Sequence, residues 1–280
     1  MTLPRKIPID TRLLFNPLDK KLIELLKSLD ASEWQKQTIA KEWKVKDVAS
    51  HLLDGSLRTL SIQRDKYVGE NPPTLGGYED IVIWLNKLNA DWINSTKRLS
   101  PQVLILLLET TGLLVSEYYE SLDPFEIAIF PVDWAGESTS FNWMHVAREY
   151  TEKWHHQQQI RDATDRNGIM SHEFFYPVMN TFFQALPYTF RNENAEEGTL
   201  IKITISSKSG GDWFLNRQTG SWVISTTHQS KPDVTIEIPS DISWKLFSKS
   251  LRPEQIIEQV TIEGDERLAK KVLDMVSVMA

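Results

Sequence analysis

The sequence predicts an α+β protein in which an N-terminal helical bundle (residues 1–191) precedes a small α+β domain (residues 192–280). Three observations support this prediction. Apolar residues recur at helical spacing from about residue 16 to 190, whereas short alternating runs typical of strands follow residue 192. The polar segment 192–198 (NENAEEG) separates the two patterns. A chain of 280 residues is also long enough to bury one or two cores of this size.

Six helices are expected in the first half, because its segments repeat apolar residues at steps of three and four. In chain order they cover residues 19–29, 45–67, 78–99, 101–122, 141–163 and 171–191. The fourth has Ser100 as a candidate N-cap and Pro101 in its first turn, a pairing that suits a helix start. The sixth contains Pro177 and Pro187 and is expected to kink at both.

Strands are expected in the second half. Residues 200–205 (LIKITI) alternate with a period of two over most of their length. Residues 213–215 and 221–224 flank a turn that contains Gly220, which predicts a hairpin. Further strands are expected at 234–238 and 260–262, and helices at 241–248 and 265–278. This mixture favours a layered α+β domain.

The composition excludes several classes of function. The formal charge of −7, with Lys and Arg spread along the chain, argues against nucleic acid as a partner. The absence of Cys excludes disulfides, a thiolate nucleophile and zinc ribbons, so any metal must be held by His, Asp and Glu. The most apolar stretch, residues 103–115, contains Glu109 and is too short to cross a bilayer. We therefore expect a cytoplasmic protein with no membrane partner.

A polar stripe runs along the helix expected at 141–163. The side chains of His145, Glu149, Glu152, His156 and Gln159 follow one another at steps of four and three, which places them on one face. Such a stripe is either a solvated surface or a polar site built inside a helical bundle. The helix by itself leaves both interpretations open.

Within this stripe, Glu152 and His156 lie four residues apart, so their side chains meet on adjacent turns. A carboxylate and an imidazole suit a divalent ion, but a third ligand must come from another helix. His51 is the natural candidate, although a lone histidine among apolar neighbours is also typical of a packed core. Gly55, one turn further on, would leave room for a ligand. His155 points about 100° away from His156 and is not expected to bind the ion.

Two segments resemble a known family. Residues 43–54 (WKVKDVASHLLD) resemble the second helix of the DinB-like metal-binding bundles, and more narrowly that of the mycothiol-dependent maleylpyruvate isomerase group. Residues 148–163 resemble that family's Glu-x-Trp-x-His-x-x-Asp-Ile-Arg segment. The resemblance implies an up-down bundle whose metal ligands are His51, Glu152 and His156. Gln159 stands where the family usually has Asp.

The resemblance covers essentially the whole chain, because the family follows its bundle with a small α+β domain similar to sterol-carrier modules. Arg252 and the pair Gly264-Asp265 resemble the Gly-Arg and Gly-Asp elements of that module. Leu251 stands where a glycine would be expected.

The function implied is that of a metal-dependent isomerase or transferase that activates a low-molecular-weight thiol for attack on a small-molecule substrate. The metal expected is zinc, with nickel as the other candidate, and the chain's lack of Cys means that the thiol must come from outside. Arg252 and Arg161 are candidates to bind a substrate carboxylate, and a structural role for each is the alternative.

Two further interpretations stay open. In the first, the protein is a non-enzymatic, metal-stabilised module whose C-terminal domain binds an apolar ligand. In the second, it is a structural or interaction protein whose polar stripe faces water. The oligomeric state is not predicted by the sequence.

Overall fold

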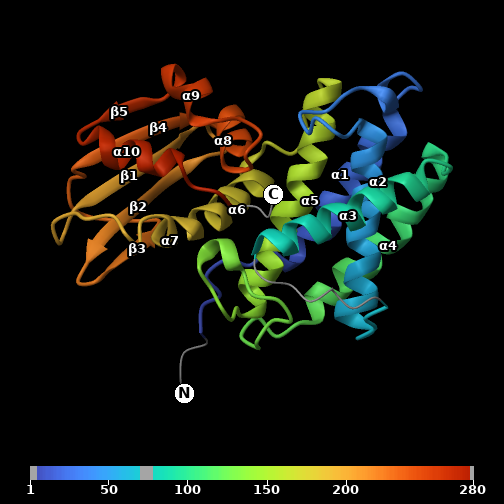
Figure 1. Ribbon diagram of the computed structural model, residues 1–280, viewed down its shortest axis with the longest axis horizontal. Coiled ribbons are helices and arrows are strands. Elements are labelled where there is room, and N and C mark those ends of the chain that lie inside the picture. Colours follow the sequence, from blue (N-terminus) through green and yellow to red (C-terminus); the bar gives the residue numbers. More distant parts are fainter. Residues whose placement is uncertain (1–4, 70–77, 278–280) are drawn as a thin grey trace. The chain divides into compact units, whose positions relative to one another are not determined.

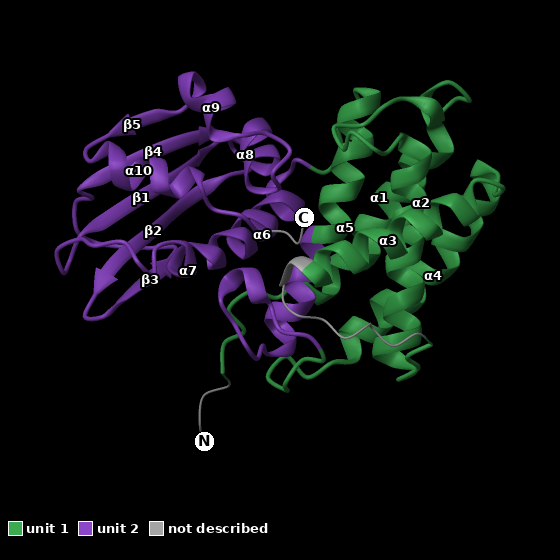
Figure 2. Ribbon diagram, in the orientation of Figure 1, with its two compact units in different colours: residues 1–129, 152–169 green, residues 130–151, 170–280 purple. Residues whose placement is uncertain are grey.

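The computed structural model describes residues 5–69 and 78–277 (Figure 1). Contacts divide the chain into two compact units, which Figure 2 distinguishes by colour. The helical unit comprises Met1–Ile129 and Glu152–Ile169, and the sheet unit comprises Phe130–Thr151 and Met170–Ala280. The long helix α5 (Asn142–Thr164) contributes to both. A boundary between separately folding domains at residues 191/192 stays a prediction.

The helical unit contains α1, α2, α3, α4 and the C-terminal part of α5. Their bounds are Phe15–Ser28 (α1), Val45–Arg58 (α2), Tyr78–Thr96 (α3) and Pro101–Ser121 (α4). The expected second helix was too long, because the α-helical hydrogen bonding ends at Arg58 and a π-helical segment, η3 (Thr59–Arg64), continues the chain. Short 3₁₀ turns lie at Arg12–Leu14 and Glu33–Gln35. No helix among residues 5–69 and 78–277 has both the length and the apolar character needed to span a membrane.

The helical unit is held by apolar stripes that face one another. Helices α1 and α2 each pack against α4, and α3 packs against α2. The buried residues of this core lie at helical spacing: Leu22, Leu25, Leu26, Val45, Val48, Leu52, Leu104, Leu108 and Ile160. Helix α4 begins as expected, with the Ser100 hydroxyl oxygen accepting from the Val103 N–H at 3.3 Å.

An ion pair lies inside this unit. The Lys153 ammonium on α5 is 2.6 Å from Oδ1 of Asp19 on α1, and the side chains are only 8% and 14% exposed. A Cβ at Gly112 of α4 would lie 2.7 Å from Asp19 Oδ2, so a larger residue there would force the carboxylate to shift. Burial raises the pKa of Asp19, and the charge of Lys153 opposes that shift.

The sheet unit is built on a mixed five-stranded sheet of order β3-β2-β1-β4-β5, which confirms the α+β fold class. The strands are β1 (Leu200–Ser206), β2 (Gly211–Gln218), β3 (Ser221–Ser225), β4 (Val234–Pro239) and β5 (Thr261–Glu263). Strands β1 and β4 run parallel, and the other neighbours are antiparallel. The β2–β3 hairpin turns through Gly220, whose φ of +77° suits a residue without a Cβ.

The helices of this unit are α6 (His172–Phe182), α7 (Leu186–Thr189), α8 (Ser240–Phe247), α9 (Pro253–Ile256) and α10 (Glu266–Leu273). The expected helix at 171–191 is broken rather than kinked, because a 3₁₀ turn (Phe183–Ala185) separates α6 from α7. Pro177 lies inside α6, and Pro187 lies in the first turn of α7, where its missing N–H costs nothing.

Aromatic side chains fill the interior of the sheet unit. Trp213 of β2 is fully buried and stacks on Tyr176 of α6, with ring centroids 5.2 Å apart and planes 23° apart. Phe183 packs on the same indole at 4.7 Å, and Trp213 Nε1 donates to Asn180 Oδ1 at 2.9 Å. Trp213 on β2 is therefore covered by the chain's own aromatic rings.

The Gly264-Asp265 element shapes the start of α10. Gly264 has a φ of +93°, and a Cβ there would collide with the carbonyl oxygen of Asp233. The Asp265 carboxylate accepts from the N–H groups of Arg267 and Leu268, and so caps the helix. Gly264 and Asp265 therefore determine where α10 begins.

Candidate metal centre

Two histidines from helices far apart in the sequence meet in the helical unit. His51 of α2 and His156 of α5 have ring centroids 4.6 Å apart, with their planes at 76°. The indole of Trp43 lies against both rings, at 4.6 Å from His51 and 5.9 Å from His156. The packing of α2 and α5 in this unit thus brings two imidazoles and one aromatic cover into a single cluster.

Glu152 lies one turn before His156 on α5. Its Oε2 is 3.7 Å from His156 Nε2. The Glu152 side chain is 37% exposed and that of His156 is 12% exposed, so the carboxylate reaches toward water while the imidazole is enclosed. The Glu152 carboxylate therefore lies beside Nε2 of His156.

Gln159 determines which nitrogen of His156 carries the proton. The Gln159 side-chain oxygen lies 3.0 Å from His156 Nδ1. Because an amide oxygen can only accept, Nδ1 is the donor and Nε2 keeps its lone pair. The Gln159 amide nitrogen lies 3.2 Å from His155 Nε2 and donates to it. One amide therefore holds two imidazoles, and it leaves the His156 nitrogen nearest Glu152 free of a proton.

Burial keeps this cluster neutral. It lowers the pKa of His156 to about 4 and the pKa of His51 and His155 well below the usual histidine value. For His51, positive charge on His156, Arg58 or His155 adds to the effect of burial. Neutral imidazoles are the form that binds metal ions. His51 Nδ1 is, in addition, a buried nitrogen without a hydrogen-bond partner.

The donor set fits a divalent ion, although the ligands are not all in position. Across the described residues, no three His, Asp or Glu side chains already surround one point where an ion could sit. Two imidazoles that share a tetrahedral zinc ion have ring centres about 5 Å apart. The separation of 4.6 Å between His51 and His156 agrees with this value. The unpartnered nitrogen of His51 and the unprotonated nitrogen of His156 are suitable donors.

The other members of the polar stripe form a separate network in the sheet unit. His145 is buried, and its Nδ1 lies 2.7 Å from Nη2 of Arg148. The same Nη2 lies 2.6 Å from Oε1 of Glu149. Burial lowers the pKa of His145 to about 4. The stripe on α5 thus contributes to two different clusters.

The two arginines named from the sequence lie in different surroundings. Arg161 is buried in the helical unit, where it donates to the carbonyl oxygens of Asn167 (2.7 Å) and Lys21 (2.9 Å). Burial lowers its pKa to about 10. Arg252 is an exposed residue of the sheet unit at the start of α9, and its N–H donates to Gln255 Oε1 at 2.7 Å.

Sequence reasoning missed two contributors to the histidine cluster. Trp43 belongs to the segment at residues 43–54, and its contact with both imidazoles depends on the loop before α2. Arg58 follows His51 by seven residues and so shares a face of α2 with it. That spacing was visible in the sequence.

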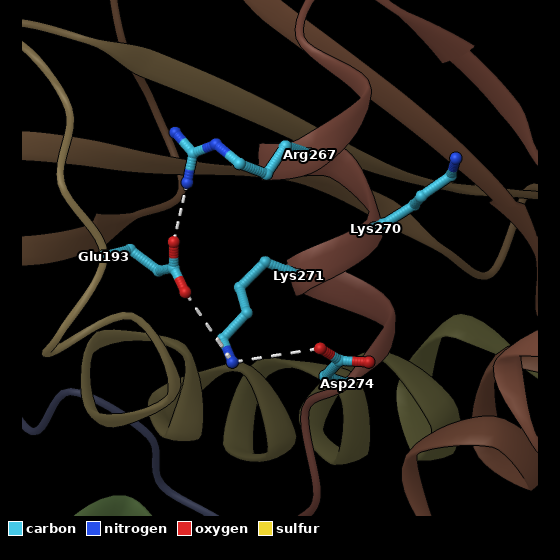
Figure 3. Close-up of a pocket in the computed structure, with 5 residues that line it drawn as sticks. All are labelled: Glu193, Arg267, Lys270, Lys271 and Asp274. Carbon is cyan, nitrogen blue, oxygen red and sulfur yellow. Dashed lines mark hydrogen bonds and ion pairs between the residues drawn. The ribbon is translucent and has the colours of Figure 1, made fainter.

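A surface pocket of the sheet unit lies beside α10 (Figure 3). Its charged residues are paired: Arg267 with Glu193 at 2.7 Å, and Lys271 with both Glu193 and Asp274 at 3.8 Å. Lys270 pairs with Glu266 at 2.9 Å. Because these cations have acidic partners, the pocket offers no excess positive charge to an anion.

Comparison with known proteins agrees with this architecture. The family model described as mycothiol maleylpyruvate isomerase N-terminal domain matches residues 15–161, and the SCP-2 sterol transfer family model matches residues 194–276. Crystal structures of the mycothiol-dependent maleylpyruvate isomerase and of a mutant of it both align at 11% identity, with TM-scores of 0.51. They cover 86% of this chain and 88% of their own.

The sterol carrier protein domain 2 of Helicoverpa armigera aligns at 22% identity over 34% of this chain and 83% of its own, with a TM-score of 0.28. No curated protein matches the chain. At 11% identity, the likeness to the isomerase structures concerns the fold. Since the first family model spans just over half of the residues, the chain belongs to the mycothiol maleylpyruvate isomerase N-terminal domain family and continues into an SCP-2 sterol transfer region.

Proposed function

We propose that this protein is a metal-dependent enzyme that uses a low-molecular-weight thiol to isomerise a small substrate or to transfer the thiol to it. The observation that carries the proposal is the pairing of two neutral imidazoles, His51 and His156, with the Glu152 carboxylate on the adjoining turn. Membership of the isomerase family supports the thiol-dependent reaction type.

The ion would be held by His51, Glu152 and His156. When bound with an open position, such an ion lowers the pKa of a thiol and polarises a carbonyl. The chain's own residues prepare the site: burial keeps both imidazoles neutral, and Gln159 holds the proton on Nδ1 of His156. The indole of Trp43 packs against both rings. Glu152, which is partly exposed and whose Oε2 lies 3.7 Å from His156 Nε2, would supply the carboxylate ligand.

The thiol must be a separate molecule, because the chain contains no Cys. The family's name points to mycothiol as the first thiol to test and to maleylpyruvate as the first substrate. Zinc is the ion we favour, with nickel second, since two imidazoles and one carboxylate suit a catalytic zinc site. Isomerisation and thiol transfer share the initial addition of the thiolate to an electrophilic carbon, and product analysis distinguishes them.

Metal analysis is the first test. Protein purified with zinc or nickel present should retain one ion per chain, whereas His51→Ala, His156→Ala and Glu152→Gln should lose it. His172→Ala, at an exposed position of the sheet unit, is the matched control and should keep the ion. Wild-type protein that stays metal-free after this treatment would refute the proposal.

Activity is the second test. Turnover of maleylpyruvate should require both mycothiol and the ion, and should stop when a chelator removes the ion. Replacing mycothiol with other thiols then identifies the preferred one. Binding of an ion without thiol-dependent turnover of this or related carboxylated substrates would leave the metal site intact and contradict the enzymatic role.

The SCP-2 match supports a second candidate function, in which the sheet unit binds an apolar ligand and the metal only stabilises the helices. This alternative predicts lipid in the purified protein, a higher melting temperature with fatty acids, and no thiol-dependent activity. The aromatic filling around Trp213 speaks against it, because the rings of Tyr176 and Phe183 already cover that indole.

A further inference from the structure

Arg58 has a buried hydrogen-bond donor without an acceptor. The guanidinium lies on the same face of α2 as His51, two turns further along. Its Nη2 binds Asp54 Oδ2 at 3.0 Å, whereas its Nε is buried and has no partner. A buried charged donor without an acceptor raises the free energy of the folded protein. The Nε–H group of Arg58 can therefore donate a hydrogen bond to a bound ligand.

The space for an acceptor lies on the same helix. Between His51 and Arg58, a Cβ at Gly55 would meet no atom within 4 Å. Directly after Arg58, the chain passes into the π-helical segment η3, a local distortion that is frequent at functional sites.

Asp54 holds Arg58 in place and limits which anion it can accept. The Asp54 side chain is 11% exposed and that of Arg58 is 36% exposed, so the carboxylate is enclosed while part of the arginine side chain reaches the surface. Together the two side chains carry no net charge, and Asp54 repels an approaching anion. A phosphate dianion is therefore disfavoured, whereas a single carboxylate can accept from the unpartnered Nε.

We propose that Arg58, oriented by Asp54, is a binding residue for a carboxylate of the small molecule that reacts at the His51–His156 cluster. This inference rests on the proposed function, because it takes the histidine cluster as the reaction centre. Arg58 thus joins Arg161 and Arg252 as a candidate to bind a carboxylate. The carboxylate belongs to the electrophilic substrate or to the thiol, and the chemistry of its recognition is the same in both cases.

Three probes distinguish the two sources of the carboxylate. Maleate represents a carboxylated substrate without a thiol. N-acetylcysteine carries both a thiol and a carboxylate, and N-acetylcysteamine carries the same thiol without the carboxylate. Each is titrated calorimetrically into zinc-loaded wild-type protein, Arg58→Gln and Arg58→Lys. Arg64→Gln is the matched control, because Arg64 is an exposed arginine just along the chain that pairs with Asp65.

Arg58→Gln should weaken the binding of at least one carboxylate probe by about 10- to 100-fold, and should leave N-acetylcysteamine within about twofold of wild type. Arg58→Lys should fall in between, because an ammonium keeps the charge but lacks the planar fork. An effect on maleate alone assigns the carboxylate to the substrate, and an effect on N-acetylcysteine alone assigns it to the thiol. Arg64→Gln should match wild type throughout.

The inference is overturned if Arg58→Gln, shown by its circular dichroism to be folded, binds both carboxylate probes as tightly as wild type. It is also overturned if wild type binds neither of them. Zinc affinity, measured separately, should be unchanged in Arg58→Gln. If wild type binds no zinc at all, the proposed function fails, and maleate binding to the metal-free protein then tests Arg58 independently.

Discussion

The side-chain oxygen of Gln159 lies 3.0 Å from Nδ1 of His156, and this contact sets the chemistry of the histidine cluster. An Asp at this position, which the resemblance noted in the sequence would lead us to expect, could accept from His156 but could not donate to His155. Gln does both, because its amide carries an acceptor and a donor. Gln159 therefore contacts two buried imidazoles and carries no negative charge beside them.

Removing this support should weaken metal binding. In Gln159→Leu, the ring of His156 loses the acceptor that holds its proton on Nδ1. The proton can then move to Nε2, the nitrogen that faces Glu152 and would bind the ion. We expect zinc affinity to fall by about 10- to 100-fold, measured by competition with a chromogenic chelator. Gln184→Leu, which removes a side-chain amide in the sheet unit, is the control. Equal affinity in Gln159→Leu and wild type would contradict this role.

The buried pair Asp19–Lys153 should be costly to break. Asp19→Ala leaves the Lys153 ammonium enclosed without its carboxylate, and we expect a loss of about 3–5 kcal/mol in the free energy of unfolding by urea. The double variant Asp19→Leu/Lys153→Met should recover most of this loss. Lys21→Ala removes the exposed Lys21–Glu24 pair on the same helix and should cost no more than about 1 kcal/mol. A small effect of Asp19→Ala would show that water reaches Lys153.

Trp213 should be essential to the sheet unit. Trp213→Ala removes a fully buried indole that packs on Tyr176 and Phe183, and we expect a loss of about 3–5 kcal/mol in stability. The space left behind is bordered by the rings of Tyr176 and Phe183 and by the Asn180 amide, and the variant should bind a hydrophobic dye that wild type does not bind. Strong dye or fatty-acid binding by wild type would instead favour the apolar-ligand function.

Acid should destabilise the metal-free protein partly through His145. Its folded pKa is about 4, compared with about 6.5 in the unfolded chain, because burial disfavours its charged form. Between these values the unfolded chain binds a proton that the folded protein does not, so stability falls as the pH drops from about 6.5 to about 4.

Between these two pKa values, His145 makes the unfolding free energy fall by ~1.4 kcal/mol for each pH unit of acidification. His145→Gln should therefore show a shallower decline of unfolding free energy between pH 7 and pH 5, measured in urea. The decline should not vanish, because burial lowers the pKa of His156 to about 4 as well. An unchanged slope in the variant would contradict the assignment.

The elements that the sequence predicted well are those defined by local rules. Helix α4 starts at Pro101 behind the Ser100 cap, and the β2–β3 hairpin turns at Gly220, because both depend on the backbone preferences of a few neighbouring residues. The end of α2 was missed. There, η3 is held by contacts to α4, in which the Tyr118 hydroxyl donates to the Gln63 carbonyl oxygen at 3.2 Å. Helical spacing carries no information on such distant partners.

The site was predictable in part for the same reason. Spacing on α5 places Glu152 and His156 on one face, and it places His145 and Glu149 on that face too. Only packing separates them: His145 and Glu149 join Arg148, whereas His156 meets His51. The partner of each polar side chain depends on which helix lies opposite it, and that is decided over the whole core.

By itself, the sequence determined the order of helices and strands, the absence of an internal thiol, and the residue types able to bind an ion. These follow from periodicity and from side-chain chemistry, which are properties of short segments. The tertiary structure decided that His51 faces His156 under Trp43, that Gln159 serves two imidazoles, and that Arg58 retains an unpartnered donor. Burial and contact between distant segments arise only when the core packs, and they set both the protonation of the histidines and the groups left to bind a ligand.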